Sequence, residues 1–143
     1  MLNNQHTKYI GIDYGKKRTG VSISDHNKVI SFPLDTIETS KLIIYLENLI
    51  PSENIEKVII GKPLKLKNQL HELENDIIQF IGLLQSIFPH IMIERIDERY
   101  TSKISNLIIR QSGINKKSRM NKSIIDKISA SLILESYLIM TNK

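Results

Sequence analysis

An α/β fold built on a mixed five-stranded sheet is predicted by the order of elements along the 143-residue chain. Three strands come first, and helices and strands then alternate. A polar, turn-prone segment at 25–27 joins the second and third strands into an antiparallel hairpin. Right-handed crossovers place the first, fourth and fifth strands parallel in the sheet centre. The expected order is β-β-β-α-β-α-β-α-α.

The strands alternate apolar and polar residues or are short and wholly apolar. The fourth reads KVIIG, which is typical of a parallel strand buried on both faces. In the first strand, alternation puts Tyr9, Gly11 and Asp13 on one face of the sheet. The five strands are expected at 8–13, 20–24, 28–33, 57–61 and 91–96.

The helices are indicated by apolar residues at helical spacing and by residues typical of helix ends. Pro51 and Pro89 follow the first two helices, Gly113 is placed to cap the third, and Ser123 is a candidate N-cap for the last. The expected ranges are 38–50, 69–88, 101–112 and 123–140.

Length and composition favour one cytoplasmic domain spanning residues 1–143, with residues 1–7 expected to be flexible. The chain has no cysteine, which excludes a disulfide framework and a thiolate metal site. No apolar run approaches the roughly 20 residues that a membrane helix needs, so no membrane partner is expected.

Charge is unevenly distributed along the chain. Residues 34–76 contain five basic and eight acidic residues, a net of −3, whereas 101–127 contain seven basic and one acidic, a net of +6. A concentrated basic segment suits a polyanion-binding face, although surface lysines are more often simply solvated.

The first candidate site is the segment GIDYGKKRTG at 11–20. Asp13 falls at the carboxyl end of its strand, where open α/β sheets place their ligands. Gly11 leaves room for a ligand or another backbone, and Gly15 and Gly20 bracket a basic turn. The alternative is a strand cap followed by an ordinary glycine turn.

Two further acidic positions are separated widely from the first. Glu98 lies in IDERYT at 96–101, a segment that leaves the same end of the sheet and could otherwise be a solvated loop. Asp126 heads a helical stripe continued by Ala130, Ile133, Tyr137 and Met140, which predicts that it faces the sheet. The alternatives are a first-turn acid that favours the helix dipole and an ion-pair partner for Lys127 or Lys122.

If the acids at 13, 98 and 126 meet, they form an oxygen-only cluster. Clustered carboxylates repel one another and are best explained by a bound dication. Oxygen ligands without cysteine suit Mg²⁺ or Mn²⁺. Two such ions about 4 Å apart can activate water and stabilise the leaving oxygen in phosphodiester cleavage.

The segments GIDYGKKRTG, VIIGKP, DERYTS and IDKISAS, in this order, resemble those of the bacterial pre-16S rRNA nuclease family, also described as Holliday-junction-resolvase-like. The resemblance covers residues 9 to about 140. It implies an RNase H-like fold, catalytic and metal-binding roles for Asp13, Glu98 and Asp126, and Mg²⁺- or Mn²⁺-dependent hydrolysis of RNA during 5′-end maturation of 16S rRNA. Lys62 and the segment LKLKNQ at 64–69 depart from the family pattern.

Basic residues near the predicted site could hold nucleic-acid phosphates, and the expected partner is precursor rRNA, either free or in a pre-ribosomal particle. Two alternatives stay open: a resolvase that acts on four-way DNA as a dimer, and a non-catalytic RNA-binding ribosome-assembly factor. A monomer or weak homodimer is expected for the rRNA nuclease. The candidate phosphate-binding residues are Lys16, Lys17, Arg18, Lys62, Arg99, Lys116, Lys117, Arg119 and Lys122.

Overall fold

The computed structural model describes residues 6–63, 68–97 and 122–142. Its centre is a five-stranded sheet in the order β3-β2-β1-β4-β5. β2 is antiparallel to its neighbours β1 and β3, whereas β4 is parallel to both β1 and β5. The strands are β1 (Lys8–Asp13), β2 (Arg18–Ser24), β3 (Ser31–Glu38), β4 (Ile55–Lys62) and β5 (Met92–Asp97).

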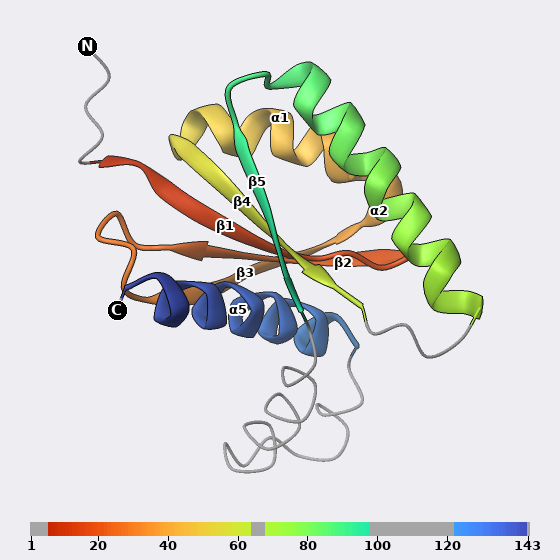
Figure 1. The fold of residues 1–143 in the computed structure, drawn as a ribbon. Coiled ribbons are helices and arrows are strands. Elements are labelled where there is room, and N and C mark those ends of the chain that lie inside the picture. Colours follow the sequence, from red (N-terminus) through yellow and green to blue (C-terminus); the bar gives the residue numbers. More distant parts are fainter. Residues whose placement is uncertain (1–5, 64–67, 98–121, 143) are drawn as a thin grey trace.

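Helices cover both faces of the sheet (Figure 1). One face carries α1 and α2 and the other carries α5, which contacts β1, β2, β3 and β4. No helix in the described ranges is long and apolar enough to cross a membrane. The helices are α1 (Leu42–Ser52), preceded by a short 3₁₀ helix at Thr39–Lys41, α2 (Asn68–Ile87) and α5 (Lys122–Thr141).

The alternation of side chains along the central strands divides the core into two clusters. Ile10, Ile12 and Ile60 are fully buried beneath α1 and α2. Ile59 points to the opposite face, where it packs with Ile133 and other residues of α5. The apolar strand of residues 57–61 is therefore buried on both faces, as its sequence predicts.

The mixed five-stranded sheet is confirmed, but the predicted boundary of β3 is wrong. The strand begins at Ser31 rather than residue 28, because Asp25 holds the preceding residues in the turn. Its Oδ1 accepts hydrogen bonds from the backbone N–H groups of Val29 and Ile30, at 2.8 and 2.9 Å. Lys28 also has a positive φ of 58°, which is incompatible with an extended strand.

Three smaller expectations also differ from the structure. β5 is parallel but lies at the edge of the sheet instead of in its centre. Pro51 lies in the last turn of α1, and Ser123 lies inside α5, which begins one residue earlier. Thr7, the last residue of the segment predicted to be flexible, is buried and donates a hydrogen bond to Glu56 at 2.7 Å, and the flexibility of that segment stays a prediction. The predicted helix at 101–112 lies outside the described residues.

A polar cluster fastens α5 to the sheet at the end where β4 begins. Lys57 Nζ donates to the Tyr137 hydroxyl at 2.7 Å and lies 3.4 Å from Glu94 Oε1. The Lys57 ammonium also lies 5.0 Å from the ring centroid of Tyr9. Only 12% of the Lys57 side chain is exposed, so this cation depends on its protein partners.

Lys57→Met is expected to lower the free energy of unfolding by about 1–3 kcal/mol at pH 7, because it leaves Tyr137 and Glu94 without their cation. Burial lowers the pKa of Lys57, but the hydrogen bond to Tyr137 and the charge of Glu94 help to raise it above 10.5 overall. The stabilisation that the charged Lys57 side chain gives to the folded state is therefore complete below pH 10.5. It is lost as pH rises through the pKa that Lys57 has in the folded state.

Urea unfolding at pH 7 and at pH 11 measures the difference in the free energy of unfolding between wild type and Lys57→Met. The gap between wild type and Lys57→Met should shrink at the higher pH. Lys41→Met, at an exposed lysine, is the control and should change stability little at either pH. A Lys57→Met gap that stayed constant across this range would contradict the role given to the ammonium.

Candidate active site

The carboxyl ends of the parallel strands β1, β4 and β5 define one end of the sheet, which we term the carboxyl end. Asp13 is the last residue of β1, and Lys62 and Asp97 are paired last residues of β4 and β5. Lys62 is exposed there, as a phosphate-binding residue would need to be. β5 ends one residue before Glu98, which lies outside the described residues.

Glycines allow α5 to lie directly on this part of the sheet. Gly20 of β2 is the ladder partner of Asp13, and a Cβ at Gly20 would overlap the backbone carbonyl of Asp126. A Cβ at Gly11 would come within 2.8 Å of the Ala130 carbonyl oxygen. The space at Gly11 is therefore occupied by a helix backbone, which is one of the two uses the sequence predicts.

A buried hydrogen bond fixes the same contact one turn further along α5. Ser22, which is fully buried beside Gly11, donates from its Oγ to the Ala130 carbonyl at 2.7 Å. A helix carbonyl normally accepts a hydrogen bond from within its own helix. The additional bond from Ser22 therefore fixes the distance of α5 from β1 and β2 and its rotation about the helix axis. The rotation matters because it determines where Asp126 points.

Asp126 comes to the carboxyl end of the sheet, as the helical stripe predicts. Its backbone touches the ladder partner of Asp13, and its side chain is 24% exposed. The stripe is buried at Ala130, Ile133 and Tyr137, but Met140 is 63% exposed, so the prediction is wrong at its far end. Two acids that are far apart in sequence thus lie on neighbouring elements.

Arg18 supplies a cation to this acid. Its Nε donates to Asp126 Oδ2 at 3.1 Å, and 42% of the Arg18 side chain is exposed. Within the described ranges, the two Nη groups of Arg18 make no hydrogen bond, and they keep four N–H donors for an added ligand. The carboxylate therefore lies in a position that already attracts positive charge.

The basic turn between β1 and β2 is held by the hydroxyl and the backbone N–H of Thr39. Thr39 Oγ1 donates to the Gly15 carbonyl at 2.6 Å, and the Thr39 N–H donates to the Lys17 carbonyl at 2.9 Å. Lys16 and Lys17 project from this turn and are exposed. Lys16 pairs with Glu72 of α2 at 2.8 Å, a surface contact that a phosphate could replace at little cost.

The remaining predicted site residues cannot be placed against this framework. Glu98, Arg99, Lys116, Lys117 and Arg119 lie outside the described residues, and α5 begins at Lys122. The described residues alone contain no group of three histidine, aspartate or glutamate side chains arranged to hold a metal ion. The described part of the candidate centre is therefore the pair Asp13 and Asp126.

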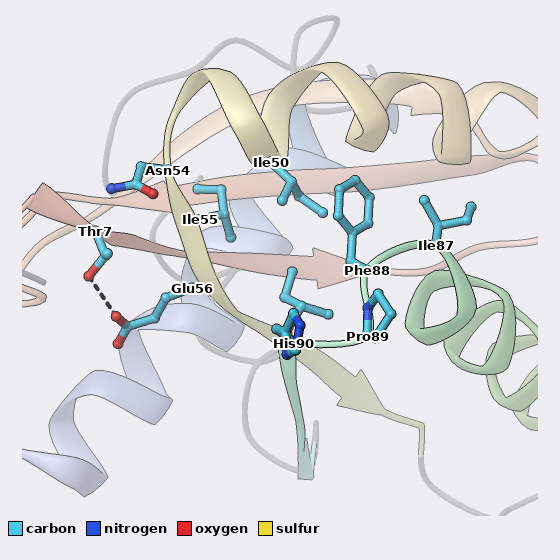
Figure 2. Close-up of a pocket in the computed structure, with 10 residues that line it drawn as sticks. Thr7, Ile50, Asn54, Ile55, Glu56, Ile87, Phe88, Pro89 and His90 are labelled. Atoms are coloured by element: carbon cyan, nitrogen blue, oxygen red, sulfur yellow. Dashed lines mark hydrogen bonds between the residues drawn. The ribbon is translucent and has the colours of Figure 1, made fainter. Parts of the chain in front are cut away.

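One hollow lies far from this pair and a smaller one lies beside it. The larger, about 330 Å³, lies near the start of β4 and the segment before β5, at the opposite end of these parallel strands from Asp13 (Figure 2). It is mainly apolar, with Ile50, Ile55 and Phe88 against the hydrogen-bonded pair Thr7 and Glu56. The smaller, about 240 Å³, is lined by the residue after Asp13, Tyr14.

Comparison with known proteins identifies the family. The profile of RuvX, described as Holliday junction resolvase, matches residues 7–140. This chain belongs to the RuvX family. Its curated relatives include proteins of Bacteroides fragilis, 37% identical over 132 residues, and Flavobacterium johnsoniae, 40% identical over 131 residues. The matches cover 92% of this chain and 96% and 95% of those relatives, both named "Putative pre-16S rRNA nuclease".

Solved structures of Thermus thermophilus RuvC resemble this RuvX chain along nearly its whole length. One, in complex with a Holliday junction substrate, has a TM-score of 0.62 at 12% identity and covers 95% of this chain and 97% of RuvC. Another has a TM-score of 0.60 at 11% identity, covering 93% and 96%. This likeness confirms the RNase H-like fold that the sequence resemblance implies.

Proposed function

We propose that this chain is a metal-dependent endonuclease that hydrolyses RNA phosphodiester bonds in the 5′-end maturation of pre-16S rRNA, in the cytoplasm. The observation that supports the proposal is that the backbone of Asp126 rests on Gly20, the ladder partner of Asp13, at one end of an RNase H-like sheet. The choice of pre-16S rRNA as the substrate is supported by membership of the RuvX family and by the names of the curated relatives.

The donor set fits a hard divalent cation. Asp13 and Asp126 offer carboxylate oxygens, and Asp126 already binds the cationic side chain of Arg18. Together with Glu98, they would hold Mg²⁺ or Mn²⁺. When bound, such an ion supplies an activated water and charge stabilisation at the leaving oxygen.

The chain's own basic residues would orient the RNA. Arg18 would place its exposed Nη groups against a phosphate beside Asp126, and Lys16 and Lys17 would contact phosphates further along the turn. Such contacts give affinity and register with little sequence selectivity. The same role is proposed for Lys62, Arg99, Lys116, Lys117, Arg119 and Lys122.

A second substrate is favoured by two findings. The family description and the RuvC complex both name the Holliday junction. Resolution of a four-way junction needs two cuts related by symmetry, and hence a dimer with two active sites. The rRNA nuclease needs only one copy, so the oligomeric state separates the two proposals.

The decisive experiment incubates the purified chain with a precursor 16S rRNA fragment or a four-way DNA junction, each with Mg²⁺, Mn²⁺ or EDTA. We expect endonucleolytic cuts in the rRNA fragment that require a divalent ion. Paired cuts in the junction alone, by a dimer in light scattering, would replace the rRNA proposal with the resolvase. Tight RNA binding without cleavage under any ion would favour a non-catalytic assembly factor.

Arg18→Gln is expected to separate metal binding from RNA binding. Without the guanidinium, Asp126 loses a competing cation, so Mn²⁺ should bind several-fold more tightly in calorimetry. In EDTA, RNA affinity should fall, and the slope of log K against log[salt] should decrease by about 0.7, as expected for one lost contact to a single strand.

Lys17→Gln is the matched control on the same turn. The Lys17 side chain is exposed and makes no ion pair within the described ranges, so its loss should reduce the salt slope without changing Mn²⁺ affinity. Equal Mn²⁺ affinity in wild type and Arg18→Gln would contradict the inference that Arg18 competes with the metal ion for Asp126.

A further inference from the structure

A hollow of about 240 Å³ lies on the α1/α2 side of the sheet, next to the carboxyl end. We propose that it is a base-binding site that receives one unpaired guanine of the RNA substrate. The inference rests on the proposed nuclease function and adds a base preference to it. The hollow is lined by Tyr14, Thr39, Ile43, Asp76, Gln79, Phe80 and Leu83.

The position of the hollow connects it to the acids. Tyr14 follows Asp13 directly, so their Cα atoms are only about 3.8 Å apart. Asp13 shares the α5 face with Gly11 by strand alternation, whereas Tyr14 packs against the core cluster under α1 and α2. A strand whose phosphate lies at Asp13 and Asp126 therefore needs to cross only the β1–β2 turn to bring a neighbouring base to Tyr14.

The walls suit a flat aromatic ring. The rings of Tyr14 and Phe80 have centroids 5.4 Å apart with an interplanar angle of 39°. Phe80 is almost fully buried, Tyr14 is half-buried, and Leu83 at the rim is 49% exposed. A base that entered here would gain aromatic contact with Tyr14 and cover the exposed part of Leu83, which is how proteins hold splayed-out RNA bases.

The polar groups of the hollow select the base. Asp76 is half-buried, and its carboxylate makes no hydrogen bond or ion pair in the described part of the chain. Burial raises the pKa of Tyr14, and the negative charge of Asp76 raises it further, which places this charge close to the ring. A carboxylate accepts two parallel N–H bonds, and the Watson–Crick edge of guanine offers two adjacent donors, N1–H and the N2 amino group.

The other bases match this carboxylate less well. Adenine and cytosine present one exocyclic amino group beside an acceptor nitrogen, and uracil presents one N–H between two carbonyls. Each would set an acceptor against the Asp76 carboxylate or leave one of its oxygens without a donor. Gln79, which is exposed at the hollow, can accept from or donate to the remaining edge of the base.

The same threonine that lines the hollow also fixes the basic turn. Thr39 bonds to the Gly15 and Lys17 carbonyls, so the hollow and the phosphate-binding turn form one unit. Lys16 lies on this turn and interacts with the charges of both Glu72 and Asp76. This lysine offsets the negative charge of Asp76, which allows an RNA phosphate to approach the turn.

The test titrates the full chain with GMP, IMP, AMP, CMP and UMP, without metal, and follows backbone amide signals by NMR. We expect GMP to shift the signals of Tyr14, Thr39 and Asp76. IMP, which lacks the N2 amino group, should bind about tenfold more weakly, because one hydrogen bond to a charged group is lost. Inorganic phosphate should leave these three signals unchanged.

Asp76→Asn should remove the preference for GMP over IMP, whereas Glu135→Gln, at an exposed acid on the opposite helix α5, should retain it. Thermal unfolding checks that both variants fold. Equal binding of all five nucleotides, or shifts confined to the β1–β2 turn, would overturn the guanine site. If the protein cleaved RNA but did not prefer GMP, only the guanine site would be refuted. If it preferred GMP but cleaved no RNA, only the proposed nuclease function would be refuted.

Discussion

Replacing Asp13 with asparagine is expected to lower the rate of RNA cleavage about 10³-fold, since a metal ion contributes several kcal/mol to the transition state and each 1.4 kcal/mol is tenfold. Asparagine has nearly the same shape but lacks the negative charge that would hold the cation. The residue lies at a strand end and outside the apolar core, so the fold should remain intact. Single-turnover cleavage of a precursor rRNA fragment measures the effect.

Asp35→Asn is the matched control. Asp35 is exposed on β3, where its Oδ1 accepts from the Thr36 N–H, and an asparagine oxygen can do the same. The control should cleave at the wild-type rate. Calorimetry should also show Mn²⁺ binding weakened in Asp13→Asn and unchanged in Asp35→Asn. An Asp13→Asn protein with full activity would remove Asp13 from the proposed centre.

The fold was predictable from sequence to the extent that it depends on local patterns. Alternation located β1, and helical spacing located α2 and α5 to within about two residues. The sequence predicts the start of β3 too early, because that start is set by two hydrogen bonds to the Asp25 side chain, which no hydropathy pattern records. The edge position of β5 depends on which strands pair, and pairing is a long-range property.

The candidate site, like the fold, was predictable where it depends on local patterns and not where it depends on long-range contacts. The apolar stripe predicts that Asp126 lies on the sheet-facing side of α5, because residues at helical spacing share one face of a helix, and the Asp126 side chain is indeed mostly buried. The ion pair of Arg18 with Asp126 joins residues 108 positions apart and had no sequence signal. The hollow beside Tyr14 was also missed, since Asp76 and Phe80 read as ordinary positions of an amphipathic helix. Only the juxtaposition of β1 with α2 gives them a shared surface.

Gly20 is the residue whose role the sequence least revealed. The motif predicts that it brackets a turn, yet it lies inside β2, and its lack of a side chain lets α5 rest on the sheet. Gly15 does serve the turn, since a Cβ there would overlap the Arg18 carbonyl. Two glycines of one motif thus serve different contacts, one within the turn and one between β2 and a distant helix.

Gly20→Ala is therefore expected to destabilise the protein by about 3 kcal/mol, at the upper end of the usual cost of overpacking, because the added methyl would overlap backbone that cannot rotate away. This corresponds to a fall in Tm of about 10 °C for a chain of this size. Since the overlapped atom is the carbonyl of Asp126, the helix must shift at the proposed metal ligand, and Mn²⁺ affinity should fall in parallel.

Gly82→Ala separates this contact from the general effect of removing a glycine. Gly82 lies in α2, and a Cβ there would meet no atom within 4 Å. Alanine at such a helix position should stabilise the protein by about 0.5–1 kcal/mol and leave Mn²⁺ binding unchanged. Calorimetric unfolding and Mn²⁺ titration of both variants provide the comparison. If Gly20→Ala were as stable as wild type, α5 could not rest on β2 at this position, and the geometry that brings Asp126 to Asp13 would be wrong.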